Sequence, residues 1–321
     1  DPLPDQVGNV DLQREERARD VLVQLGFQET INYSLTTPEA ESAFLEKGVE
    51  HVTLLNPISS ERSVMRRSVL ASVLEIVASN LRHTDDVRVF EIGKVYEPHS
   101  GHQLPDEQRR LTIAMTGSRE IEHWDDSNKK KTPLDFFDLK GVIEALVEDL
   151  HLAKVSYRPS GCEHLHPGRS ADLILGKESV GSFGQLHPGI QDEKKFGTRA
   201  ILVADLDLEK ILPKIPFRHA YQTVSRFEVA KRDIAILVDE NISAEEVANA
   251  IQTAGGKLLK EATLFDLYRG ESIEAGKKSL AYALTYQSPE KTLTEKEIEK
   301  AHKKVEGYLK HQLKAKIRGK E

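Results

Sequence analysis

A short segment near the middle of the chain carries the residue types that metal ions and nucleophilic catalysis use. It reads Cys162-Glu163-His164-Leu165-His166. In an extended segment the cysteine and both histidines would share one face, which leaves a metal site open as an alternative. However, no second cluster supplies a fourth ligand at the spacing of structural zinc sites, and no oxyanion feature accompanies Cys162 as a nucleophile. We therefore predict a hydrogen-bonded loop here, with no metal ligand and no catalytic residue.

Common catalytic motifs are missing from the rest of the sequence. It contains neither of the two common Gly-rich phosphate loops and no Gly-x-Ser-x-Gly nucleophile elbow. Two His-Pro-Gly turns, at residues 166–168 and 187–189, are expected to reflect hairpin geometry rather than a ligand role, because Pro fixes φ and Gly permits positive φ. The sequence alone thus names no chemistry that this chain performs by itself.

Length and composition indicate a globular protein. The chain has 321 residues, enough for two ordinary domains, with 39% apolar and 30% charged residues. It has no apolar run of the ~18–20 residues that a membrane span requires. It begins Asp-Pro-Leu-Pro-Asp, without a secretory signal or an initiator Met, so we expect a fragment of a longer protein. A single cysteine excludes an internal disulfide and favours a reducing cytoplasm.

Charge is unevenly distributed along the chain. The net charge is −7, but residues 226–321 hold 18 Lys and Arg against 16 Asp and Glu. An acidic body with a mildly basic end weakly indicates an anionic partner for that end.

The first two thirds of the chain alternate helical and strand patterns. Residues 1–9 read as a linker, and a helix over 14–25 is expected to end at Gly26. Ser59 or Ser60 is predicted to cap a long helix whose apolar face begins at Val69 and continues to Leu81. The other expected elements are strands at 27–33, 87–90, 111–116, 155–157, 171–175, 179–186 and 201–205, a loop at 98–110 and a helix at 135–150. The pattern predicts an α+β domain built around an antiparallel sheet.

The last third is more regular. Two prolines stiffen a second linker, 209–225. Strands are expected at 233–238, 258–268, 278–287 and 314–318, with helices at 243–254 and 294–313. Each helix starts with a capping box, Ser243 with Glu246 and Thr294 with Glu297. The order β-α-β-β-α-β predicts a ferredoxin-like domain over residues 226–318, followed by a short tail at 319–321.

Several motifs together resemble the bacterial phenylalanyl-tRNA synthetase β subunit family. The segment from Asn56 to Tyr96 contains NPISSERSVMRRSVL and ends with RVFEIGKVY. The last third contains KRDIAILVDE, LFDLYRG, GKKSLAYALTYQS and TLTEKEIEKAH in the family's order. The resemblance implies a class II synthetase-like core over residues 10–208 and an anticodon-binding module over 226–318.

The resemblance also implies that this core is a non-catalytic scaffold. A catalytic class II core needs one Arg for the ATP phosphates and a Gly-rich segment that ends in a second Arg. Arg66, Arg67 and Arg88 lie near the first position, but no such Gly-rich segment follows. Arg66 and Arg67 have an equal alternative as solvated residues on a helix face. The implied whole enzyme is a cytoplasmic α2β2 ligase that attaches phenylalanine to tRNA-Phe using ATP and Mg²⁺, neither of which this portion is expected to bind.

The predicted RNA contacts lie in the last third of the chain. In related sheets, aromatic side chains on the open face stack on bases. Tyr268 and Tyr286 are predicted near strand ends, where their rings could be exposed. The expected phosphate contacts are Arg232, Arg269, Lys277 and Lys278. A basic run in the last helix and tail is either a further phosphate contact or a solvated helix face.

Two other functions remain as alternatives. One is a stand-alone RNA-binding protein with a ferredoxin-like domain, which would bind RNA without an enzyme partner. The other is a small-molecule enzyme that uses Cys162, His164 and His166, which predicts a cleft around a cysteine with a perturbed thiol pKa. No DNA and no membrane partner is expected.

Overall fold

The computed structural model describes residues 8–99, 101, 104–120, 124, 131–216, 218, 221, 223–270 and 272–318. Most of the predicted linker 1–9 and all of the tail 319–321 lie outside the described residues. The chain divides into two compact units, Asp1–His219 and Ala220–Glu321.

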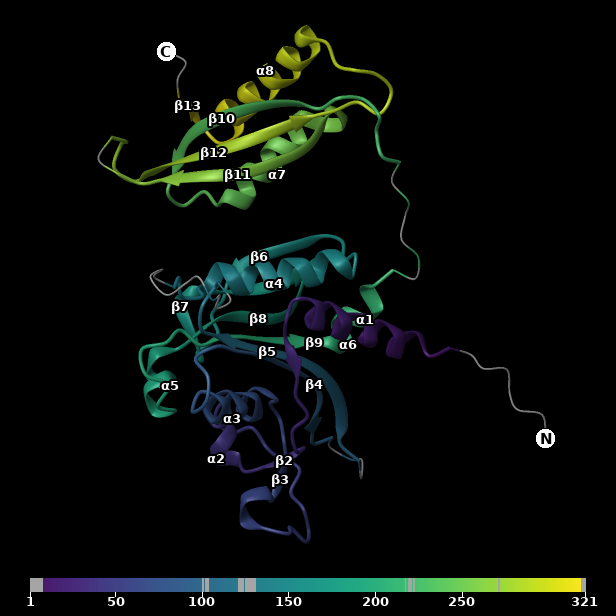
Figure 1. Ribbon diagram of the computed structural model, residues 1–321, viewed down its shortest axis with the longest axis vertical. Helices are drawn as coiled ribbons and strands as arrows, with labels where there is room; N and C mark the ends of the chain where they lie inside the picture. Colours follow the sequence, from purple (N-terminus) through teal and green to yellow (C-terminus); the bar gives the residue numbers. More distant parts are fainter. Residues whose placement is uncertain are drawn as a thin grey trace, which may run out of the picture. The chain divides into compact units, whose positions relative to one another are not determined.

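The first unit is built on a seven-stranded sheet in the order β1-β4-β5-β9-β8-β7-β6 (Figure 1). Its strands are β1 (Gln28–Glu29), β4 (Val87–Glu97), β5 (Asp106–Thr116), β6 (Val155–Pro159), β7 (Leu165–Leu175), β8 (Glu178–Leu186) and β9 (Leu202–Asp207). Only the β1–β4 pair is parallel, and all the other neighbours are antiparallel. The predicted antiparallel α+β domain is therefore confirmed.

Two apolar clusters cover the two faces of this sheet. Helices α1 (Val10–Gln24) and α4 (Phe136–Asp149) pack on the face that carries Phe90 and Ile113. Helix α3 (Leu70–Asn80) packs on the opposite face, against Val87 and Val89. Neighbouring residues of β4 thus face different cores, as strand alternation requires. Gly26, which has a φ of +86°, ends α1 as predicted.

The segment before α3 differs from the prediction. The helix begins at Leu70, and neither Ser59 nor Ser60 caps it. Instead, a 3₁₀ turn at Ser60–Arg62 leads into β3 (Val64–Met65), which pairs with β2 (Leu35–Thr36). Backbone hydrogen bonds from Ser63 to Thr36 and from Arg66 to Ser34 hold this stretch extended. These long-range pairings were not visible in the local pattern that favoured a helix.

Three strands also differ in length from their predictions. β5 begins at Asp106 because it pairs with β4 along its whole length, so residues 106–110 of the expected loop 98–110 belong to the strand. β7 begins at Leu165 and contains the first His-Pro-Gly turn as an irregularity before Ser170. β1 is only two residues long, whereas a strand over 27–33 was expected.

The second His-Pro-Gly turn starts a helix rather than a hairpin. His187 precedes α5 (Pro188–Glu193), and its Nδ1 accepts a hydrogen bond from the backbone N–H of Gly189 at 3.2 Å. His166 makes the same local bond to Gly168 at 3.0 Å. Both histidines therefore have turn-forming roles. A further short helix, α2 (Pro38–Glu41), follows β2.

The predicted linker 209–225 begins as packed structure. Helix α6 (Leu208–Ile211) and a 3₁₀ turn at Leu212–Lys214 bring Ile211, Leu212 and Ile215 into the core of the first unit. Arg14 fixes this end by donating to the Ile215 carbonyl at 2.6 Å. Burial of three apolar side chains explains why the two prolines do not mark a free connection here.

The second unit has the predicted β-α-β-β-α-β order. Its elements are β10 (Ala230–Asp239), α7 (Ala244–Gly255), a 3₁₀ turn (Gly256–Leu258), β11 (Leu259–Tyr268), β12 (Lys277–Tyr286), α8 (Glu295–Gln312) and β13 (Lys316–Ile317). The four strands form one sheet in the order β11-β12-β10-β13, with both helices packed on one face. Both predicted capping boxes are present. The ferredoxin-like fold is confirmed.

Candidate nucleic-acid interface

Arg66 is buried inside the first unit and belongs to a closed polar network. Its guanidinium donates to the Glu91 carboxylate at 2.7 Å and to the Lys94 carbonyl at 2.8 Å. Asn32 donates to the second Glu91 oxygen at 2.6 Å. Arg66 and Glu91 are 3% and 2% exposed. The alternative of a solvated helix residue is therefore wrong for Arg66, and its charge is already neutralised by Glu91.

Arg67 is engaged by the protein in a different way. Its guanidinium donates to the Glu50 carbonyl at 2.7 Å and to Glu97 at 3.1 Å. Its backbone N–H donates to the fully buried carboxylate of Glu41, which also accepts from the Ser68 N–H and from His51. This carboxylate organises the chain just before α3. Arg67 precedes that helix, so it does not lie on a helix face either.

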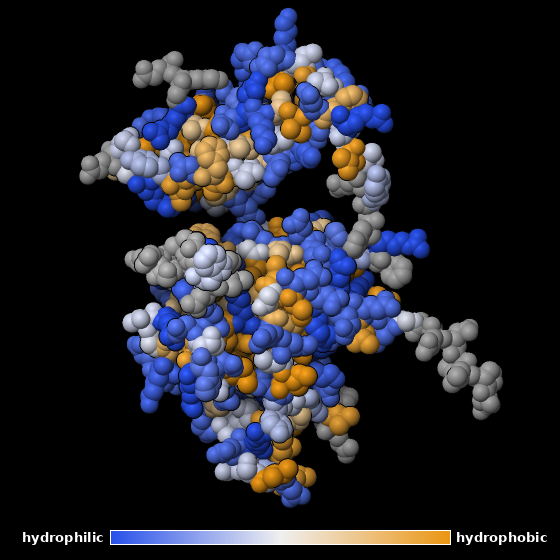
Figure 2. Space-filling view, viewed as in Figure 1, coloured by the Kyte–Doolittle hydropathy of each residue, from blue (hydrophilic) through white to orange (hydrophobic). Residues whose placement is uncertain are grey.

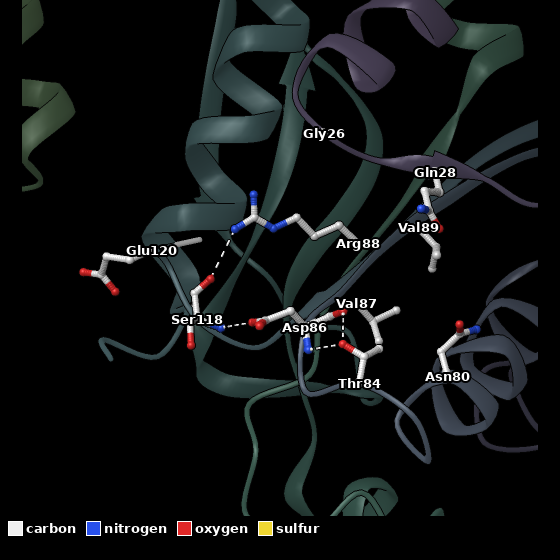
Figure 3. A pocket seen from close by; sticks show the side chains of 10 residues that line it. All are labelled: Gly26, Gln28, Asn80, Thr84, Asp86, Val87, Arg88, Val89, Ser118 and Glu120. Atoms are coloured by element: carbon white, nitrogen blue, oxygen red, sulfur yellow. Dashed lines mark hydrogen bonds between the residues drawn. The ribbon is translucent and has the colours of Figure 1, made fainter. Parts of the chain in front are cut away.

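Arg88 is the third arginine near the position expected for phosphate binding. It lies in β4 and lines a cavity of about 580 Å³ (Figure 3). Its guanidinium donates to the Ser118 carbonyl at 3.2 Å, while Asp86 accepts from the Ser118 N–H at 2.5 Å. Asp86 and Glu120 also line the cavity. A lining that contains two carboxylates and a single arginine is unsuited to a polyphosphate.

The segment around Cys162 does form a cleft, of about 590 Å³, lined by residues 43–47 and 161–164. The thiol lies 3.2 Å from Nδ1 of His164. Burial raises the pKa of the Cys162 thiol and lowers the pKa of His164, so neither group is pushed toward its charged form. An activated nucleophile needs the opposite shift. Among the described residues, no group of three or more His, Cys, Asp or Glu is arranged to hold a metal ion.

The predicted phosphate contacts in the second unit are mostly paired within the protein. Arg232 lies 2.5 Å from Glu295 and Arg269 lies 2.7 Å from Glu240. Lys277 and Lys316 both pair with Glu274, and their hydrogen bonds lower the pKa of Glu274 to about 2. The Arg232 and Arg269 pairs are exposed, so each arginine can exchange its carboxylate for a phosphate.

Lys278 differs from the expectation. It is 8% exposed, and its ammonium donates to the Glu240 carbonyl at 2.9 Å. Its side chain therefore faces inward, because position 278 lies on the helix-covered face together with Leu280 and Tyr282.

The two predicted stacking tyrosines separate into a buried and an exposed residue. Tyr286 has no exposed surface, and its hydroxyl lies 3.3 Å from Nδ1 of His302. The expectation of an exposed Tyr286 ring is therefore wrong, because strand alternation places it in the core with Tyr282. Tyr268 ends β11 and is 39% exposed, with the Arg318 guanidinium 6.0 Å from its ring centre.

Sequence reasoning missed an exposed apolar edge on β11. Leu264, Phe265, Leu267 and Tyr268 are all exposed, and Phe265 most of all at 58%. The pairing with β12 shifts between Leu264 and Asp266, so Phe265 occupies a β-bulge. The four residues lie within LFDLYRG, where two pairs of adjacent apolar residues flank Asp266 and break the alternation. This break in the alternation is the feature of the sequence from which the exposed edge could have been predicted.

Each of the two units, the antiparallel α+β unit and the ferredoxin-like unit, matches a known protein family. The family model described as "Phenylalanyl tRNA synthetase beta chain CLM domain" matches residues 5–208. The "Ferredoxin-fold anticodon binding domain" matches residues 225–318. The chain therefore belongs to the phenylalanyl-tRNA synthetase beta chain family.

Individual relatives agree with this assignment. The chain is 38% identical over 313 residues to the phenylalanine–tRNA ligase beta subunit of Syntrophotalea carbinolica and 37% identical over 309 residues to that of Bacillus subtilis. These alignments cover 96% and 95% of this chain but only 38% of each relative. A solved pyrrolysyl-tRNA synthetase of Desulfitobacterium hafniense is 17% identical, with a TM-score of 0.48, over 63% of this chain and 65% of that chain.

Proposed function

We propose that this chain is a non-catalytic part of a phenylalanine–tRNA ligase: the first unit packs on a catalytic α subunit of an α2β2 enzyme, and the second unit helps to bind tRNA-Phe. ATP and Mg²⁺ would serve the α subunit in the cytoplasm. The observation that carries the non-catalytic role is the closed Arg66–Glu91–Asn32 network. Because Glu91 already neutralises Arg66 in the interior, this arginine has no charge to offer a phosphate.

An exposed apolar tip supports docking to a partner subunit. We define the apolar tip as four exposed residues in the segments that precede β2 and β3: Ile31, Tyr33, Leu55 and Ile58. Leu55 and Ile58 are 98% and 99% exposed. Figure 2 shows hydrophobic side chains at the end of the first unit where Figure 1 places β2 and β3. Apolar side chains as exposed as Leu55 and Ile58 favour contact with another protein.

The β11 edge supports binding of unpaired bases. Phe265 and Tyr268 offer exposed rings, and Arg269 follows immediately with an exposed guanidinium. An aromatic platform beside an exchangeable cation suits a base with its phosphate. A stand-alone RNA-binding protein would use the same edge, but it would leave the apolar tip without a function.

The apolar tip provides the test of the proposed function. A β subunit carrying Leu55→Asp and Ile58→Asp should fail to co-elute with its α subunit in size-exclusion chromatography, because two carboxylates would be buried in the interface. Leu104→Asp with Val224→Asp is the matched control, since both residues are also strongly exposed, at 79% and 87%. Undiminished co-elution of the tip variant would contradict docking through this surface.

Within the described residues, no helix is long and apolar enough to cross a membrane.

A further inference from the structure

Helix α8, coloured yellow in Figure 1, carries one face on which every charged residue is basic. Successive residues of an α-helix are rotated by about 100° around the helix axis. With this rotation, several positions of α8 lie within one sector of about 120°. We define the α8 basic face as these positions: Lys296, Lys300, Lys303, Lys304, Gly307, Lys310 and His311. All seven are exposed, and no acidic residue falls inside the sector. From Lys296 to Lys310 the face runs about 21 Å at 1.5 Å per residue.

Most of these lysines have no ion-pair partner among the residues that the structure describes. Lys303 forms an exposed pair with Glu299 at 2.7 Å. Lys296, Lys300, Lys304 and Lys310 form no ion pair with any described residue. The paired cations of this unit, such as Arg232 and Lys277, lie on other elements. Four of the five lysines of the α8 basic face therefore carry positive charge that no described carboxylate pairs with, in a chain whose net charge is −7.

Helix stability does not account for this arrangement. Cations are favourable in the last turn, which explains Lys310 and His311. Lys296 is the second residue of the helix, where the positive end of the helix dipole disfavours a cation. A face selected only for solubility would mix both signs of charge.

Gly307 is a second, independent departure from what the helix needs. It lies in the middle of the α8 basic face, where glycine is the poorest helix former after proline. A Cβ at this position would meet no atom within 4 Å, so no packing within the described chain requires glycine. The missing side chain leaves a gap between Lys303 and Lys310 through which another backbone can approach the helix closely.

We propose that the α8 basic face binds the sugar-phosphate backbone of RNA, which crosses the helix at Gly307. The proposal rests on the proposed function of the second unit and adds to it a surface on the helix-covered side of the sheet. The lysines would supply sequence-independent phosphate contacts, leaving recognition of bases to other elements. The linear row of charges and the central gap fit a polyanion better than a compact anion.

The test is a salt titration of RNA binding. Fluorescence anisotropy with a labelled tRNA-Phe anticodon stem-loop measures the affinity of the chain at several NaCl concentrations. The variant Lys296→Gln, Lys300→Gln, Lys304→Gln should lower the slope of log K against log salt by about 2 to 3, because each phosphate contact contributes about 0.7–0.9. Affinity at 0.1 M salt should fall at least about tenfold. The matched control neutralises Lys47, Lys154 and Lys177, which are also exposed, and should leave the slope unchanged.

A second variant separates binding from stability. Gly307→Ala should raise the melting temperature, since alanine favours the helix, and should weaken RNA binding severalfold with little change in salt slope. An ordinary solvated position would show the gain in stability without the loss of binding.

The outcomes also separate this proposal from the proposed function. If the chain binds the stem-loop but the triple variant and its control behave alike, the α8 proposal is wrong and the RNA-binding role stands. If the triple variant instead loses α-subunit association while RNA binding is unchanged, the face is a protein interface and the α8 proposal is again wrong. If the unaltered chain does not bind the stem-loop at any salt concentration, both are wrong.

Discussion

At the scale of residues, the buried pair of Arg66 and Glu91 stands out because each depends on the other. The ion pair is 2.7 Å long and nearly inaccessible to water. Burying a charge is costly, and the cost is offset only while its partner is present. A pair of this kind holds β3 and β4 together rather than binding a ligand.

Removing one member of this pair should be strongly destabilising. Arg66→Met leaves the Glu91 carboxylate buried without its cation, and we expect the free energy of unfolding to fall by about 3–5 kcal/mol. Urea unfolding followed by circular dichroism measures the change. Arg66→Met combined with Glu91→Leu should recover most of the loss, and the exposed Arg82→Met should cost under about 0.5 kcal/mol. A loss below about 1 kcal/mol for the single variant would show that water reaches Glu91.

At the scale of elements, the start of α8 contributes a pH-dependent part of stability. Hydrogen bonds from Lys291 and from the backbone and hydroxyl of Thr294 lower the pKa of Glu297 to about 2, from an ordinary value of 4.5. A carboxylate with a lowered pKa in the folded state stabilises the fold above its unfolded pKa. That contribution is lost as the pH falls from about 4.5 toward 2.

The corresponding prediction concerns the melting temperature. Between pH 7 and pH 5 the contribution of Glu297 should be constant, and below pH 4.5 it should diminish. Glu297→Gln should therefore lower the melting temperature at pH 7 but make little difference near pH 2. Scanning calorimetry of both chains across this range provides the measurement. If the difference in melting temperature between the two chains does not shrink on acidification, the Glu297 carboxylate is not the group that makes the stability depend on pH.

The helices and strands also show which parts of the fold could be predicted from the sequence and which could not. The second unit was predictable because its strands and helices follow in a regular β-α-β-β-α-β order and both helices start with capping boxes, at Ser243 and Thr294. The segment before α3 was not, because its extended conformation depends on hydrogen bonds to Ser34 and Thr36, far away in the sequence. Strand β5 was underestimated for the same reason, since polar residues from Asp106 onward are held by β4.

The candidate site was predictable in part. Tyr268 is exposed near a strand end as expected, whereas Tyr286 is buried because its position in β12 lies on the same face as the core residue Tyr282. Phe265 was not among the predicted contacts, and its exposure depends on a β-bulge that shifts the pairing of β11 and β12. Local periodicity gives the type of element, but the face of each residue depends on the pairing of strands.

At the scale of the whole molecule, the chain combines two units with different proposed partners. The first unit contains the buried Arg66–Glu91 ion pair and the apolar tip. The second unit contains the exposed aromatic residues of β11 and the α8 basic face. Because the chain spans about 38% of the length of its relatives, its role has to be tested in a complete β subunit. If the two units bind different partners, a substitution in one unit should weaken binding of its own partner and leave binding by the other unit unchanged.

The most direct test is to delete residues 225–318 from the β subunit and assay the enzyme reconstituted with its α subunit. Two activities are compared: attachment of phenylalanine to tRNA-Phe, and exchange between ATP and pyrophosphate that depends on phenylalanine. We predict that the shortened subunit still assembles with α and keeps the exchange activity, while tRNA charging falls sharply. Equal loss of both activities in an assembled enzyme, or unchanged charging, would contradict the account of a docking scaffold joined to an RNA-binding unit.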